Sequence, residues 1–231
     1  MIPRVLIDVA EVPGGGGELR LIQRGSEFSI MLGANELMNS RLSGSEEALA
    51  AMACQRISAT ARPRLLIGGL GMGFTLRAAL NALRAGARIE VAELVPAVIR
   101  WALDPMAPLF GGSLTDARVS ILEADVGDLI ASARALYDAI LLDVDNGPDG
   151  LTRAANDRLY DMDGLGRARG ALRPGGVLAI WSSRPDRAFS QRLRKAGFAV
   201  EEVTVRANAG RSGARHVIWL AARTAGRAPG E

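Results

Sequence analysis

Four carboxylates in this chain stand at or just after the ends of short apolar runs: Glu93, Asp125, Asp143 and Asp145. Each run predicts a strand of an open parallel sheet. Ligands of such sheets bind beyond the carboxyl ends of the strands, near the point where the strand order reverses. Carboxylates in that place can accept hydrogen bonds from a ligand or take a proton from a reacting group. We therefore expect these acids to contribute to one site.

Three glycines, Gly69, Gly71 and Gly73, separate the apolar run 65–67 from a predicted helix. Glycines spaced G-x-G-x-G allow a tight turn from strand to helix and let a ligand approach the backbone. Glu93 follows at the tip of the next predicted strand, where its carboxylate can accept hydrogen bonds from both hydroxyls of a ribose. This combination indicates a Rossmann-type sheet that binds a nucleoside.

The glycine spacing also bears on which nucleoside is bound. The dinucleotide motif G-x-G-x-x-G, counted from Gly69, needs its third glycine at position 74, where this chain has Phe74. The pattern therefore favours S-adenosylmethionine or a relative over NAD. Two alternatives stay open at this point: a nicotinamide oxidoreductase, and a glycine-rich turn that binds no ligand.

Composition restricts the function further. The chain has 231 residues, of which 48% are hydrophobic and 4% aromatic, which suits one α/β domain and a small appendage. Its arginines are scattered rather than clustered, so we expect no nucleic-acid partner. Cys54 and His216 are the only residues of their types, which argues against a disulfide or a metal centre. Without a signal peptide or an apolar segment of membrane-spanning length, we expect a cytoplasmic protein that has no membrane contact.

The elements that must position these residues follow from the apolar pattern. Residues 1–44 predict a small antiparallel β domain with strands at 5–9, 19–24 and 27–32, and a helix at 46–57 follows. From residue 64 strands and helices alternate. Strands are expected at 64–68, 88–93, 118–123, 138–143 and 176–182, and helices at 73–85, 96–104, 126–135, 157–172 and 187–196.

The end of the chain completes this plan. The last two strands, 199–206 and 215–222, are joined by a short glycine-rich loop and predict an antiparallel hairpin. The fold class is therefore α/β, a Rossmann-like sheet of parallel strands closed by a hairpin. We predict a nucleoside-binding transferase domain at 45–223 and a disordered tail at 224–231.

Several segments together resemble the spermidine synthase family of polyamine aminopropyltransferases. They are the glycine turn, Ala92-Glu93, Ala124-Asp125, Tyr137–Asp143 and Leu172–Leu178. The resemblance implies a class I S-adenosylmethionine-binding fold, aminopropyl transfer from decarboxylated S-adenosylmethionine to putrescine, and a homodimer. It also implies that Glu93 holds the ribose, Asp125 the adenine, and the three glycines the turn under the donor.

The chain departs from the family at several positions that matter for chemistry. In the family motif G-G-G-D-G-G, the aspartate that receives the donor's amine aligns with Met72. The catalytic aspartate of D-S-S-D-P aligns with Asn146, and Asp143 matches the first acid of that motif. In the family motif Y-x-E, the tyrosine aligns with Ser45 and the glutamate with Glu47.

These departures favour methyl transfer over aminopropyl transfer to a small-molecule acceptor. Asp145 is then expected to take the proton, beside Asn146, while Asp143 holds the loop and Glu46 or Glu47 binds the acceptor. The mechanism calls for no metal. A non-catalytic nucleoside-binding homologue, acting as a sensor or assembly partner, is the alternative. His216, in the last predicted strand, is expected to be structural, because that hairpin is remote from the strand ends that carry the acids.

Overall fold

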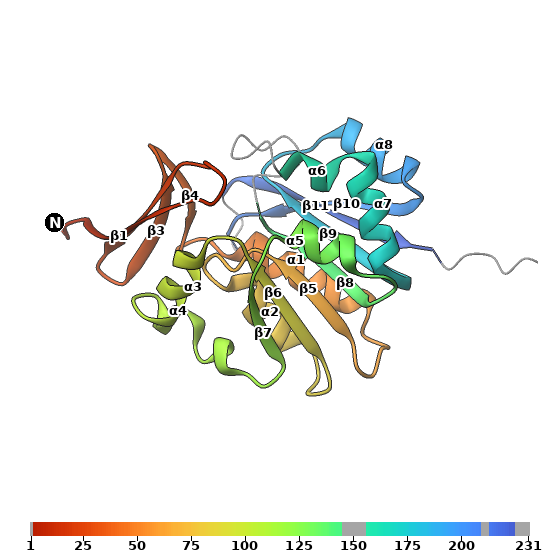
Figure 1. The fold of residues 1–231 in the computed structure, drawn as a ribbon, viewed down its shortest axis with the longest axis horizontal. Helices are drawn as coiled ribbons and strands as arrows, with labels where there is room; N and C mark the ends of the chain where they lie inside the picture. Colours follow the sequence, from red (N-terminus) through yellow and green to blue (C-terminus); the bar gives the residue numbers. More distant parts are fainter. Residues whose placement is uncertain (1, 145–155, 209–212, 225–231) are drawn as a thin grey trace, which may run out of the picture.

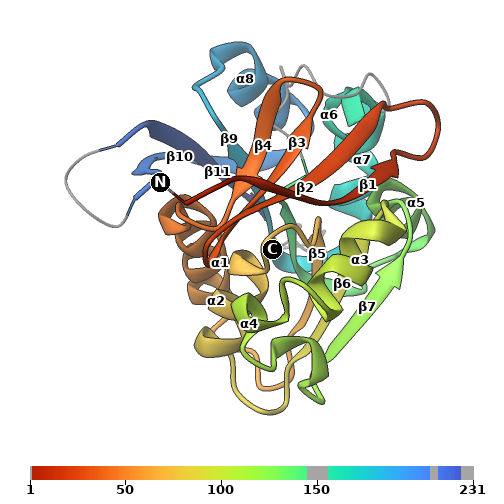
Figure 2. The same ribbon diagram turned by 90° about the vertical axis from the view of Figure 1, so that its left-hand side faces the viewer.

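The computed structural model describes residues 2–144, 156–208 and 213–224 of the chain, which form two β-sheets and their covering helices (Figure 1). The smaller sheet is antiparallel, in the order β1-β2-β3-β4. The larger sheet has the order β10-β11-β9-β8-β5-β6-β7. The small sheet stands at one end of the large one, and helices cover both faces of the large sheet (Figures 1 and 2).

The elements follow one another in this order. The small sheet comprises β1 (Val5–Glu11), β2 (Glu18–Arg24), β3 (Glu27–Leu32) and β4 (Asn35–Asn39). The large sheet comprises the parallel strands β5 (Arg64–Gly68), β6 (Arg88–Glu93), β7 (Val119–Glu123), β8 (Tyr137–Leu142) and β9 (Leu172–Ser182), with the antiparallel β10 (Phe198–Arg206) and β11 (Arg215–Arg223). The helices are α1 (Gly44–Arg56), α2 (Phe74–Ala82), α3 (Pro96–Leu103), α4 (Ala107–Phe110), the 3-10 turn η1 (Ser113–Thr115), α5 (Val126–Ser132), α6 (Asp157–Tyr160), α7 (Met162–Ala171) and α8 (Arg187–Lys195).

Both faces of the large sheet are buried, which explains why its central strands are apolar throughout rather than alternating. Leu65 and Ile67 of β5 pack into one hydrophobic cluster, together with residues of α1, α2 and α3. Leu66 points to the opposite face, where it packs with residues of α5, α7 and α8. The predicted fold class, a parallel α/β sheet closed by a hairpin beside a small antiparallel sheet, is confirmed.

Some predicted boundaries are wrong for identifiable reasons. The helix predicted at 157–172 is two helices, because the Asp161 side chain caps α7 by accepting a hydrogen bond from the Gly164 amide at 2.6 Å. The fifth parallel strand begins at Leu172 rather than at 176. The short elements α4 and η1, which flank Gly111 and Gly112, were not predicted.

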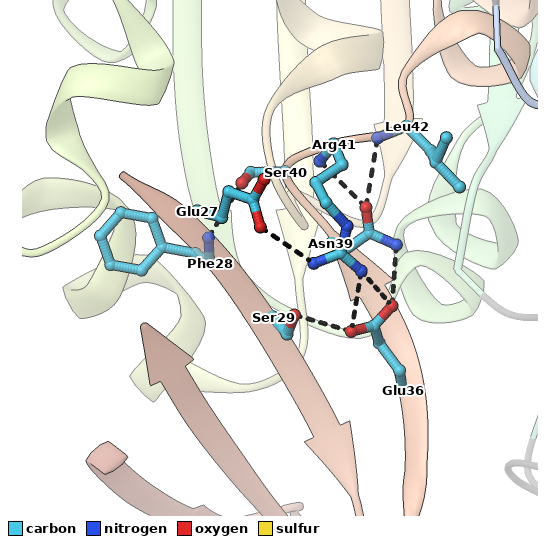
Figure 3. Close-up of polar contacts among 8 residues, drawn as sticks. All are labelled: Glu27, Phe28, Ser29, Glu36, Asn39, Ser40, Arg41 and Leu42. Atoms are coloured by element: carbon cyan, nitrogen blue, oxygen red, sulfur yellow. Dashed lines mark hydrogen bonds and ion pairs between the residues drawn. The ribbon is translucent and has the colours of Figure 1, made fainter. Parts of the chain in front are cut away.

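The strand β4 was also missed, since its first residues are Asn35 and Glu36, which have low strand propensity. A polar cluster around the Glu36 carboxylate fastens it (Figure 3). That carboxylate accepts hydrogen bonds from Ser29 Oγ at 2.7 Å, Asn39 Nδ2 at 2.9 Å and Arg41 Nη2 at 3.0 Å. The Ser29 bond links β4 to β3, and the bonds from Asn39 and Arg41 hold the Glu36 side chain in place, so side-chain hydrogen bonds rather than strand propensity explain this strand.

Three expectations about the chain as a whole have different outcomes. No helix among the described residues is long and apolar enough to cross a membrane. The tail predicted at 224–231 lies, apart from Thr224, outside the described residues. The division into domains at residue 44 stays a prediction.

Candidate active site

The candidate site lies where the strand order of the large sheet reverses. From β5 the chain continues to β6 and β7 on one side of the sheet and then crosses to β8 and β9 on the other. The glycine turn follows β5 and Asp143 follows the neighbouring β8, so the two motifs meet at this point. The Asp143 amide donates to the Gly68 carbonyl oxygen at 3.1 Å, which ties them together. Ligands of open parallel sheets bind at such reversal points.

A cavity opens here, with about 1370 Å³ of empty space including its mouth. Its floor is the glycine turn, residues 69–74, and its sides are the segments that follow β6, β7 and β8. The small sheet covers it, because Leu37 and Met38 of β4 reach the cavity from above. The cavity brings together the following residues predicted from the sequence: Gly69, Gly71, Gly73, Glu93, Asp125, Asp143 and Glu46.

The three glycines are required by the turn itself as well as by any ligand. Gly69, Gly71 and Gly73 have φ angles of +90°, +47° and +75°, a region that favours glycine. A Cβ at Gly69 would collide with the backbone carbonyl of Asp143, and one at Gly73 would collide with the Phe110 ring. The chain's own packing therefore forbids larger residues here, which the sequence-based argument about ligand approach did not foresee.

The substitution Gly73→Ala should accordingly be costly. We expect a loss of about 2–4 kcal/mol in the free energy of unfolding, from the left-handed backbone and from overpacking against Phe110. Denaturant unfolding measures it. Gly166→Ala is the matched control, because Gly166 lies inside α7 and an added Cβ there would meet nothing within 4 Å. The control should be neutral or slightly stabilising, and equal unfolding midpoints for the two variants would contradict the packing argument.

Glu93 lies where the glycine turn meets the end of β6. Its side chain is buried, at 7% exposed. One carboxylate oxygen accepts from the Leu70 amide at 3.0 Å and the other from the Val95 amide at 2.8 Å, so the residue fastens the glycine turn to the end of β6. Burial raises the pKa of Glu93 against the lowering effect of these amides. The backbone amides of Gly71 and Leu94 also lower its pKa, and ribose binding by Glu93 stays a prediction.

Asp125 begins the helix α5. Its Oδ1 accepts from the Gly127 amide at 2.8 Å, a standard helix cap, and its Oδ2 forms an ion pair with Arg158 at 2.6 Å. The residue also lines the cavity beside Ala124. The helix cap and the ion pair are sufficient reasons for an aspartate at this position. Adenine binding by Asp125 stays a prediction.

Asp143 and Glu46 form a pair of acids in the cavity. Thr75 Oγ1 donates to Asp143 Oδ2 at 2.6 Å. Burial, and secondarily the Glu46 carboxylate, raise the pKa of Asp143 to about 7. Burial likewise raises the pKa of Glu46. Two carboxylates in one poorly solvated cavity oppose each other's ionisation, and a carboxyl group with a pKa near neutrality is suited to accept a proton from a substrate.

The remaining predicted site residues lie elsewhere. Asp145 and Asn146 fall outside the described residues. Glu47 lines a separate hollow together with Arg77 and Asp116, and is not part of the cavity wall. Met72 is buried at 4% exposed and contributes to both the hydrophobic core and the cavity wall.

His216 was expected to be remote from the strand ends that carry the acids, and the structure places it near another acid, Glu46 at the start of α1. Its Nδ1 lies 2.9 Å from Ser45 Oγ, and that hydroxyl donates to Glu46 Oε2 at 2.6 Å. The contact exists because α1 packs against β9, β10 and β11, which brings the start of α1 to the C-terminal hairpin. Positions 45 and 216 are too distant in sequence for any local pattern to reveal this.

One further residue of the site was missed. Thr75 is in the first turn of α2, directly after the glycine turn, so its position alone could have suggested that it faces the next strand end. Trp181 lines the cavity from the end of β9, and its indole nitrogen is buried without a hydrogen-bond partner among the described residues.

The glycine turn, the buried glutamate after the second parallel strand and the cavity at the reversal point define the class I S-adenosylmethionine-type fold. Within that class, the chain has the fold of spermidine synthases. A spermidine synthase in complex with the transition state analogue AdoDATO matches it with a TM-score of 0.73 and 16% identity, over 95% of this chain and 73% of that one. Human methyltransferase-like protein 13 in complex with SAH has a TM-score of 0.56 and 20% identity, over 79% and 80% of the two chains.

A curated homologue adds sequence similarity. Polyamine aminopropyltransferase 1 of Streptomyces coelicolor is 31% identical over 150 residues, which are 61% of this chain and 27% of that protein. The chain thus spans about a quarter of the length of this relative. No family model matches the chain. By name, the curated homologue is an aminopropyltransferase, and the two solved structures are a spermidine synthase and a methyltransferase-like protein. None of the three supports the alternative of a non-catalytic nucleoside-binding protein.

Proposed function

We propose that this protein transfers an alkyl group from an adenosyl sulfonium donor to an amine. The observation that carries the proposal is the pair of acids, Asp143 and Glu46, in the same cavity as Glu93 and the glycine turn. A nucleoside on the turn would present its sulfonium toward the acids. Two carboxylates that resist joint ionisation gain most from a bound cation, and an amine substrate arrives in water as an ammonium ion.

The reaction then needs one proton transfer and one displacement. Asp143 takes a proton from the bound ammonium group, which leaves a neutral amine with a free lone pair. That nitrogen attacks the carbon attached to the sulfonium, so a C–N bond forms as the C–S bond breaks, and the neutral thioether nucleoside leaves. The protein's main contribution is to align nitrogen, carbon and sulfur, because the sulfonium is already a good leaving group.

The group that moves is the finer part of the proposal. Aminopropyl transfer is our first candidate, because the curated homologue is named an aminopropyltransferase and because Asp143 supplies a base although position 146 is Asn146. Met72 favours the second candidate, methyl transfer, since its thioether cannot pair with the amine of a decarboxylated donor. Putrescine is the acceptor to try first, and the homodimer expected from the family stays a prediction.

Calorimetry and a turnover assay with four ligands test this function. S-adenosylmethionine, decarboxylated S-adenosylmethionine and methylthioadenosine are expected to bind, and NAD is not. With putrescine present, the decarboxylated donor should yield methylthioadenosine and an aminopropylated diamine. If S-adenosylmethionine yields a product and the decarboxylated donor does not, the reaction is methyl transfer. If NAD binds and the three adenosyl compounds do not, the proposed function is wrong.

A further inference from the structure

Three side chains form a hydrogen-bonded row behind the cavity: Glu46, Ser45 and His216. Ser45 Oγ donates to Glu46 Oε2 at 2.6 Å and lies 2.9 Å from His216 Nδ1. Ser45 is fully buried, so its hydroxyl has these two partners and no access to bulk water. The row joins two elements far apart in sequence, the start of α1 and the strand β11.

The Ser45 hydroxyl has one hydrogen, so it can donate to only one of its two neighbours at a time. The row therefore has two possible hydrogen-bonding arrangements. When Glu46 is ionised, Ser45 donates to the carboxylate, and His216 must then donate from Nδ1 to Ser45. When Glu46 is protonated, it can donate to Ser45, which in turn donates to an unprotonated Nδ1, and His216 carries its proton on Nε2. The two arrangements differ by one proton. When each hydrogen bond of the second arrangement passes one proton along, His216 becomes an imidazolium ion, and loss of its Nε2 proton then gives the first arrangement.

The two ends of the row lie in different surroundings. Glu46 lines the cavity that also contains Asp143. His216 is only half-buried, and its ring packs edge-on against Trp181 with centroids 4.7 Å apart. Burial lowers the pKa of His216, which keeps the imidazole neutral. The charged groups nearby are Glu46 and Asp143 in the cavity, Glu47 next to Glu46 on α1 but outside the cavity, and Arg206 and Arg215, which face each other on β10 and β11 beside His216.

We propose that Ser45 and His216 are a proton relay that connects Glu46 to the outer side of the C-terminal hairpin. Its use rests on the proposed function, since transfer of an alkyl group to an ammonium substrate releases one proton per turnover. Asp143 takes that proton and must lose it before the next cycle. Glu46 shares the cavity with Asp143, and a proton that reaches Glu46 moves to Ser45 while the Ser45 proton moves to His216 Nδ1. His216 then releases its Nε2 proton to solvent and is left as the Nδ1–H form. The half-buried ring must exchange that proton for one on Nε2, by turning Nδ1 toward solvent, before the row can pass the next proton.

The single histidine makes the relay directly observable, without any activity assay. Nitrogen-15 NMR of the full chain labelled at histidine reports which ring nitrogen bears the proton. We expect a neutral imidazole that changes from the Nε2–H to the Nδ1–H form as pH rises and Glu46 ionises. Glu46→Gln and Ser45→Ala should each abolish this change. One unchanging tautomer across the pH range in the parent protein would overturn the relay.

Turnover distinguishes a relay from a purely positional contact. His216→Asn keeps an N–H donor near the Nδ1 position but cannot pass a proton on, so we expect kcat at least about tenfold lower, with donor affinity by calorimetry unchanged. Free imidazole should restore part of that rate. Full activity in His216→Asn would reduce the contact to positioning. If the parent protein turned over no donor, the proposed function would fail, whereas the NMR result would still decide the relay.

Discussion

Asp143→Asn is expected to slow turnover by roughly 10²–10⁴-fold, the usual contribution of a general base, while the affinity for the nucleoside donor stays near that of the parent protein. Asparagine has nearly the shape of aspartate and its Oδ1 can still accept the Thr75 hydroxyl, which donates to Asp143 at 2.6 Å. Only the ability to take a proton is lost. Calorimetry with the donor and a product assay measure the two quantities separately.

The pH dependence of the parent protein checks the same assignment. The pKa of Asp143 is raised to about 7, chiefly by burial and then by Glu46. Since the carboxylate is the active form, kcat/KM should fall as pH decreases through about 7 and reach a plateau above it. A profile that stays level down to pH 5, or an Asp143→Asn variant with full activity, would place the base elsewhere, and Asp145 would be the next residue to test.

The Asp143→Asn variant should also be more stable to unfolding than the parent protein at high pH. The folded protein binds the Asp143 proton more tightly than the unfolded chain, where the pKa is near its ordinary 3.8. The favourable contribution of this group is therefore fully present below about pH 3.8 and is lost as pH rises through about 7. Asparagine avoids that loss, so Tm of Asp143→Asn should exceed that of the parent at pH 8 and match it at pH 4.

Glu93→Ala is expected to weaken nucleoside binding more than tenfold, because a buried charged hydrogen bond is worth roughly 1.5–3 kcal/mol. It should also destabilise the fold, since the amides of Leu70 and Val95 both lose their acceptor. An unpaired buried amide costs about 1–3 kcal/mol. Donor calorimetry under conditions where the variant is folded, together with denaturant unfolding, gives both values.

Glu90→Ala separates binding from stability. Glu90 is on the same strand as Glu93 and accepts hydrogen bonds from the Tyr137 hydroxyl at 2.8 Å and from Arg64 Nε at 3.2 Å, but it does not line the cavity. We expect this control to lose stability and to keep its donor affinity. Equal losses of affinity in the two variants would show that the Glu93 effect comes from general destabilisation, and the ribose assignment would then fall.

The parallel sheet could be predicted because its signals are local. Strands such as β5 are short apolar runs, and the glycines at 69, 71 and 73 mark the turn by their freedom at positive φ. The apolar pattern did not predict β4, because its Glu36 is held by hydrogen bonds from Ser29 on β3 and from Arg41 just after β4. The pattern failed again at Asp161, where one cap divides an apparently continuous helix.

The sequence by itself determined the fold class and the part of the cavity formed by the glycine turn and the strand-end acids, because strand periodicity, glycine turns and strand-end acids depend on neighbours within a few residues. Only the tertiary structure decided the rest. It placed Glu46 in the cavity and Glu47 outside it, and it brought Ser45 and His216 together. These contacts join α1 to β11 through packing across the whole sheet, and a pKa near 7 for Asp143 depends on that packing as well.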